Sequence, residues 1–101
     1  LKRVENLKGI YVSGLSELLE ESFPGCTIIL FGSYSRGEDT INSDIDIAVI
    51  GTKGKDIDLT VFKKKLEKEI RINFYTSFKG IHLDLKSNIV SGITLSGAVQ
   101  L

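Results

Sequence analysis

Two acidic side chains, Asp44 and Asp46, stand two residues apart at the start of an apolar run. Because side chains alternate along a strand, a strand here places both carboxylates on the same face. Two negative charges this close repel each other unless a cation lies between them. Carboxylate oxygens select hard ions such as Mg²⁺ or Mn²⁺, and Mg²⁺ is usually held by one or two carboxylates together with substrate phosphates. The pair therefore predicts a divalent metal site beside a phosphate-bearing substrate.

A candidate phosphate-binding turn precedes the acids. The hydrophobic run 27–31 leads directly into Gly32 and Ser33. Glycine allows the backbone to approach a ligand closely, and the free amides at a helix start attract an anion. We predict a short helix over 34–36, capped by Ser33, with Arg36 reaching the same phosphates. A phosphate turn beside a metal pair suits attack on the α-phosphate of a nucleoside triphosphate, because the metal stabilises the charge that develops on the leaving pyrophosphate.

The elements that must position these residues follow from hydrophobic periodicity and from turn residues. Apolar spacing predicts helices over 3–22, about 59–70 and 81–91, and strands over 27–31, 45–50, 71–76 and 93–95. The alternation of helices and strands indicates an α/β (α+β) fold, with a sheet of about four strands and helices packed over at least one face. The pattern leaves open whether the second and third strands run parallel or antiparallel.

Composition limits the remaining possibilities. The chain has 101 residues, 42% hydrophobic and 26% charged, which predicts a single globular domain over 1–101. Thirteen basic and thirteen acidic residues balance, so a broad nucleic-acid-binding surface is not indicated. The apolar runs are too short to span a bilayer. The lone cysteine, Cys26, cannot form an internal disulfide, so we expect a cytoplasmic protein.

The spaced motif Gly-Ser-x-x-x-Gly followed by Ser-Asp-x-Asp-x-x-Val resembles the minimal nucleotidyltransferase branch of the DNA polymerase β-like nucleotidyltransferase superfamily. The matching positions are Gly32, Ser33, Gly37, Ser43, Asp44, Asp46 and Val49. The resemblance implies the single-domain nucleotidyltransferase fold, a mixed sheet of about four strands with flanking helices. It also implies that the Gly-Ser pair binds the triphosphate, that the two aspartates hold Mg²⁺ or Mn²⁺, and that a nucleoside monophosphate is transferred to an acceptor hydroxyl.

One position departs from this family pattern. The family normally places a third carboxylate on a later strand, facing the first two, and the aligned position here is Asn73. An asparagine carbonyl can coordinate a metal, but it carries no charge and is a poor general base. Two hypotheses therefore stay open. The domain is either a nucleotidyltransferase or a catalytically weakened module that binds a nucleotide or a partner.

The resemblance also implies partners. Members of this branch often act as antitoxins paired with an HEPN-domain ribonuclease toxin, and they modify a tyrosine of that toxin with AMP. We therefore expect the domain to bind a nucleoside triphosphate, with ATP as the first candidate, and to have an HEPN-domain partner protein. A third option is a piece of a larger regulatory protein, because the chain begins with Leu1 rather than methionine. Base specificity and acceptor stay open.

Overall fold

The computed structural model describes residues 1–97, while residues 98–101, the end of the predicted domain, lie outside the described residues. Within the described part, four strands form one sheet in the order β3-β2-β1-β4. The strands are β1 (Thr27–Phe31), β2 (Ile45–Ile50), β3 (Ile70–Tyr75) and β4 (Ile93–Ser96). Strand β1 pairs antiparallel with β2 and β4, whereas β2 and β3 run parallel. The predicted mixed sheet is confirmed. The relative direction of the second and third strands, which the sequence pattern left open, is parallel.

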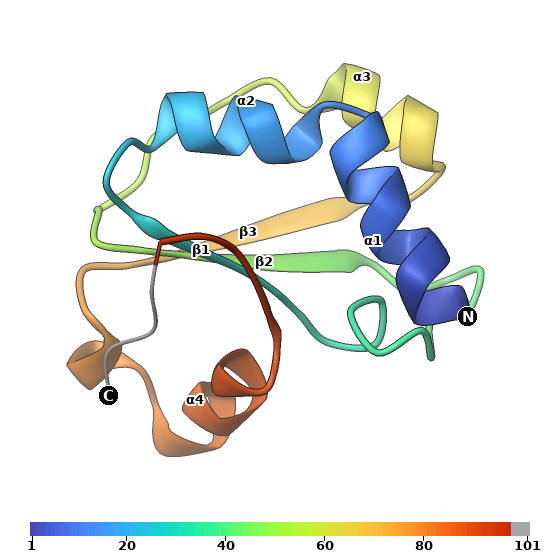
Figure 1. Cartoon of the computed structure of the whole chain (residues 1–101). Helices are drawn as coiled ribbons and strands as arrows, with labels where there is room; N and C mark the ends of the chain where they lie inside the picture. The colour runs from blue at the N-terminus through green and yellow to red at the C-terminus, as the bar shows by residue number, and fades with distance from the viewer. Residues whose placement is uncertain (98–101) are drawn as a thin grey trace.

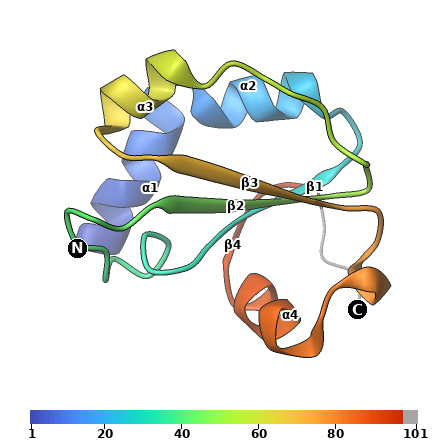
Figure 2. The same cartoon turned by 180° about the vertical axis from the view of Figure 1, so that it is seen from behind.

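Helices cover both faces of this sheet (Figures 1 and 2). The α-helices are α1 (Lys2–Val12), α2 (Leu15–Ser22), α3 (Thr60–Leu66) and α4 (Leu83–Val90), and a 3-10 helix η1 spans Phe78–Gly80. Helices α1, α2 and α3 form one layer, and α4 packs beneath the opposite face. Strand β1 is buried on both faces, which explains its continuous run of β-branched and large apolar residues.

The core therefore has two parts, one on each side of the sheet. The fully buried residues on the α1–α2 side are Ile10, Leu15, Leu19, Ile28, Leu30, Ile45, Ile47 and Val49. The α4 side buries Ile29, Phe31, Ala48, Ile50, Phe78, Ile81 and Ile89. Side chains alternate between the two parts along β1 and β2, as the pleat of a strand requires. Asp46, two positions before Ala48, therefore points to the α4 side.

The single helix expected over 3–22 is wrong, because the segment forms two helices that meet at Gly14. This glycine has φ +87°, a left-handed conformation that a residue without a side-chain Cβ adopts at little cost. Ser13 and Gly14 close α1 with hydrogen bonds to Gly9 and Tyr11. The break lets α2 cross the sheet at a different angle from α1 (Figure 1).

The helix predicted over about 59–70 is also shorter than expected. Helix α3 ends at Leu66, and Glu67 follows in a left-handed conformation with φ +54°. Ile70, predicted to be the last apolar residue of that helix, instead begins β3 and pairs with Ile45. None of the helices in residues 1–97 has both the length and the apolar character needed to cross a membrane.

Candidate functional site

The turn after β1 lies directly against the second acid of the motif. Gly32 has φ +80°, and a Cβ placed on it would lie 2.6 Å from Oδ2 of Asp46. The cause is the pairing of β1 with β2, in which Phe31 is the partner of Asp46. Glycine therefore serves two physical needs here, a left-handed backbone and close approach to a carboxylate.

The short helix expected over 34–36 is wrong, because the segment forms consecutive turns. The amides of Arg36 and Glu38 both donate to the carbonyl of Ser33, at 3.2 and 2.9 Å. A helix this short has too few hydrogen bonds to offset its nucleation cost, and the left-handed Gly37 ends the turn. Nothing among residues 1–97 accepts a hydrogen bond from the amides of Ser33 and Tyr34. The segment thus presents free amides without a helix.

Asp44 and Asp46 lie on the same side of the sheet. Arg71 of β3 is the register partner of Asp46, and parallel partners share a face. The Nε of Arg71 lies 2.6 Å from Oδ2 of Asp44, so that carboxylate reaches the same side. One guanidinium therefore contacts the first acid and stands beside the second.

The charge of this pair is only partly balanced. Burial raises the pKa of Asp46, Asp44 raises it further, and Arg71 opposes both effects without cancelling them. An ionised Asp46 is therefore costly in the domain as it stands, and a cation at the pair would lower that cost. The two carboxylates are a suitable donor set for one divalent ion.

Asn73 shares the face of the acids but is not beside them in register. It pairs with Ala48, two residues further along the parallel strands, whereas the position paired with Asp46 holds Arg71. No three or more His, Cys, Asp or Glu side chains gather as a metal site within the described 97 residues. Arg71 was not a predicted site residue, because its place beside Asp46 depends on the register of β3, which local spacing does not reveal.

Arg36 lies on the outside of the turn. Its side chain is 47% exposed, and its Nε lies 3.3 Å from Oε2 of Glu38. This contact is an exposed ion pair of the kind that contributes little stability and exchanges easily. The predicted contact of Arg36 with phosphate stays a prediction.

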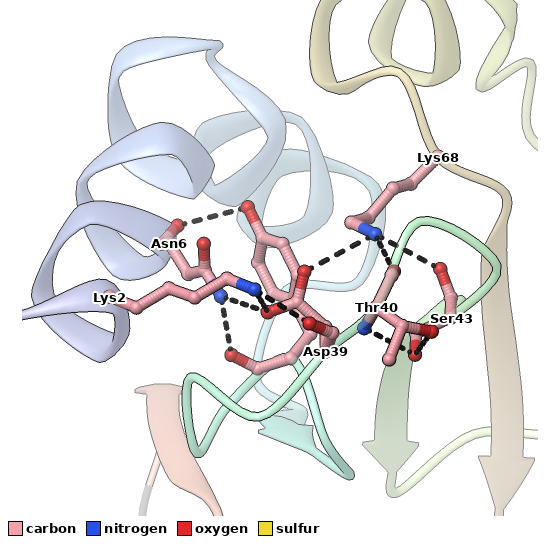
Figure 3. Close-up of polar contacts among 7 residues, drawn as sticks. Lys2, Asn6, Asp39, Thr40, Ser43 and Lys68 are labelled. Carbon is pink, nitrogen blue, oxygen red and sulfur yellow. Dashed lines mark hydrogen bonds and ion pairs between the residues drawn. The ribbon is translucent and has the colours of Figure 1, made fainter.

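A third aspartate, Asp39, lies at the centre of a buried polar cluster that the motif did not predict (Figure 3). Its side chain is 5% exposed, and its Oδ1 accepts a 2.8 Å hydrogen bond from Nδ2 of Asn6. The ammonium groups of Lys2 and Lys68 lie 3.4 and 3.2 Å from its two oxygens. Burial raises the pKa of Asp39, but the hydrogen bonds from Asn6 and Lys68 and the charge of Lys2 outweigh burial and lower it.

This Asp39 cluster connects the two halves of the site (Figure 3). Asn6 also donates to the carbonyl of Tyr34 in the turn, at 3.0 Å. Lys68 donates to the carbonyls of Thr40 and Ser43, at 2.7 and 3.3 Å, immediately before the acid pair. Side chains from α1 and from the α3–β3 connection thereby hold both the turn and the loop that leads to β2.

Comparison with known proteins agrees with this geometry. A family model for the nucleotidyltransferase domain matches residues 12–96. No curated protein matches the chain. Among the solved structures similar to it are two for which the likeness covers 83% of this chain and 71% of theirs. One is a crystal structure of a toxin–antitoxin with AMP-PNP, at 27% identity and a TM-score of 0.59.

The other is the toxin–antitoxin MntA–HpeT carrying two Asp-to-Glu substitutions, at 26% identity and a TM-score of 0.58. Both structures share the fold of this chain, the fold that positions the Gly32 turn against Asp46. The family model spans the turn, the acid pair and all four strands. The chain therefore belongs to the nucleotidyltransferase domain family.

Proposed function

We propose that the domain binds a nucleoside triphosphate with Mg²⁺ or Mn²⁺ and transfers its nucleoside monophosphate to an acceptor hydroxyl. The observation that carries this proposal is the direct contact of the Gly32 turn with Asp46, with Asp44 on the same side. A phosphate bound at the turn would then lie next to oxygens that attract a divalent ion. Phosphoryl chemistry needs this combination of positioning and charge neutralisation.

The turn supplies the phosphate contacts. The amides of Ser33 and Tyr34 are free of acceptors in the described chain, so they are available to an anion. The Ser33 hydroxyl adds a donor at the same place, and Gly32 lets the ligand approach the backbone. Arg36, exposed at the edge of the turn, serves as a further phosphate contact once it leaves Glu38.

Asp44 and Asp46 would hold the divalent ion together with the substrate phosphates. The raised pKa of Asp46 supports this role, because it reports negative charge that the domain's own cations do not satisfy. When bound, the ion stabilises the charge on the leaving pyrophosphate. Asn73 stays the candidate for a third, uncharged position, on the same face but further along β3.

The two similar solved structures support the proposal that this domain has a protein partner and a nucleotide substrate. One is a toxin–antitoxin with AMP-PNP, and the other carries Asp-to-Glu changes at two positions that are two residues apart, the spacing of Asp44 and Asp46. We therefore propose ATP as the substrate and an antitoxin role in the cytoplasm. The proposed partner is an HEPN-domain ribonuclease toxin, and the proposed acceptor is a tyrosine hydroxyl of that toxin.

A labelling experiment tests the transfer. The domain is incubated with ATP, GTP, CTP or UTP labelled on the α-phosphate, with Mg²⁺ or Mn²⁺, and with a candidate helical ribonuclease. We expect label on the partner, with ATP preferred, and none with the Asp44→Ala, Asp46→Ala double variant. Persistence of label in that variant would refute the metal assignment.

The alternative function is a binding module without turnover. It is favoured by one observation, that β3 presents Arg71 and Asn73 to the site instead of a third acid. Calorimetry with a non-hydrolysable ATP analogue separates binding from transfer. If the site is an enzyme weakened at this position, Asn73→Asp should raise the transfer rate. Measurable nucleotide binding with no transfer in either protein would favour the module.

A further inference from the structure

Arg71 stands in the site at the place where a cation is needed. Its Nε lies 2.6 Å from Oδ2 of Asp44, and it is the β3 partner of Asp46. Its positive charge acts on both carboxylates. An arginine remains charged at any pH that the folded domain experiences. The acid pair is therefore already provided with one permanent positive charge by the protein itself.

This arrangement sets up a competition. A divalent ion at the pair would compete with Arg71 for the Asp44 carboxylate, whose Oδ2 accepts the hydrogen bond from this arginine. It would also lie within a few ångströms of the guanidinium charge, and like charges at that distance repel. The Arg71 side chain is 69% exposed, so its head can leave the carboxylate and enter water at small cost.

A nucleotide changes the balance of this competition. Its phosphates add negative charge beside Asp46 and can accept two parallel hydrogen bonds from the displaced, planar guanidinium. Metal arriving with a nucleotide therefore meets less repulsion than free metal does. The divalent ion takes the place of Arg71 at the acids while Arg71 moves to the phosphates, so each group of negative charges keeps a cation beside it.

We propose that Arg71 is the resident counter-cation of the acid pair, which weakens binding of free divalent metal and yields to a metal–nucleotide complex. The proposal rests on the proposed function in one respect, that the two acids are the metal ligands. It goes beyond that function by assigning to this arginine a preference for metal that arrives with its nucleotide.

The test is a titration of the whole chain with Mn²⁺, followed by electron paramagnetic resonance of the free ion, without nucleotide. We expect Arg71→Gln to bind Mn²⁺ about five- to tenfold more tightly than the unmodified protein, because one competing cation is gone. Arg71→Lys, which keeps the charge, should bind about as weakly as the unmodified protein. Arg3→Gln removes the same charge from an exposed position of α1 and should leave the affinity unchanged.

A second titration with the non-hydrolysable ATP analogue present should reduce the advantage of Arg71→Gln. Equal Mn²⁺ affinity in Arg71→Gln and in the unmodified protein would overturn the proposal. Adding Asp44→Asn and Asp46→Asn to Arg71→Gln must abolish the gain. If Mn²⁺ binding requires these acids but Arg71→Gln does not raise the Mn²⁺ affinity, the counter-cation role of Arg71 is wrong, while the proposed metal site is supported. Circular dichroism checks that each variant is folded.

Discussion

Asp39 and Asp46 are seven residues apart in the chain, and their carboxylates have opposite surroundings. Asp39 is buried at 5% exposure, yet two lysines and an asparagine side chain satisfy it and lower its pKa. Asp46 is less buried, yet burial and the charge of Asp44 raise its pKa, because the nearest cation, Arg71, makes its hydrogen bond to Asp44 and offsets them only in part. The domain therefore satisfies one acid fully and leaves the other short of positive charge.

This difference separates a structural carboxylate from a binding one. A buried charge with complete partners stabilises the arrangement around it, and its loss leaves those partners unpaired. A charge with incomplete partners costs stability and is retained where a ligand completes it. The Asp39 cluster accordingly holds the loop, and the acid pair remains available for a cation.

The largest expected effect is on nucleotide transfer, and it distinguishes the acid pair from the Asp39 cluster. Asp44→Asn with Asp46→Asn should lower nucleotide transfer by about a thousandfold or more, because the metal ligands are lost. The free energy of unfolding should not fall, since the change removes repulsion and only an exposed ion pair. Labelled-nucleotide transfer and urea unfolding measure the two quantities. A matching loss of stability would mean that these acids are also structural.

The next effect is on stability. Asp39→Asn should lower the free energy of unfolding by about 2–4 kcal/mol, because Lys68 is left without its carboxylate in a nearly buried position. Urea denaturation checks this. Asp84→Asn, which makes the same change at a side chain 94% exposed, is the control and should alter stability little. If both variants unfold alike, the Asp39 cluster does not hold the loop.

Gly32→Ala tests the contact between the turn and the acid pair. The alanine should cost about 1–2 kcal/mol from its left-handed backbone, and it should also weaken nucleotide binding by pushing against Asp46. Gly25→Ala is a matched control, because Gly25 has nearly the same φ, +79°, but a Cβ there meets nothing within 4 Å. Calorimetry with nucleotide should distinguish the two variants, and equal affinities would argue against a phosphate role for the turn.

The smallest expected effect is on the pH dependence of the free energy of unfolding. Because the pKa of Asp39 is lowered in the folded state, its contribution to stability is complete above the ordinary aspartate pKa. The contribution is lost as the pH falls through the folded-state value. The contribution of Asp46 to stability has the opposite sign. Because its pKa is raised in the folded state, the native state becomes less favourable as the pH rises through the folded-state pKa of Asp46. Urea unfolding from pH 7 to pH 3 should show a shallower acid slope in Asp39→Asn, and an unchanged slope would contradict the assignment.

Local spacing in the sequence was enough to predict the acid pair and its neighbouring turn. Asp44 and Asp46 share a face because strand side chains alternate, and Gly32 follows β1 because a β-branched run ends there. The same spacing carried the resemblance to the nucleotidyltransferase family, which the family model confirms. The order of elements along the chain also sufficed to indicate an α/β sheet with flanking helices, while the mixed strand directions were implied by the family resemblance.

Sequence spacing was not sufficient to predict the helices where the local preference of a segment competes with the packing of its side chains. The apolar period continues through Gly14, yet the chain breaks there so that α2 can cover the sheet. The turn over 33–37 replaces the expected helix, because Tyr34 is buried and tied to α1 through Asn6. Propensity alone cannot weigh such contacts.

Only the tertiary structure decided which charges meet. Asp39 contacts Asn6 from 33 positions away, and Lys68 reaches the loop before β2 from the connection between α3 and β3. Arg71 stands beside Asp46 only because β3 runs parallel to β2 in one register, and a shift of two residues would bring Asn73 there instead. Sequence spacing determines the face on which a side chain lies, because strands alternate. Strand register and helix docking determine its neighbours, because they depend on the packing of the whole core.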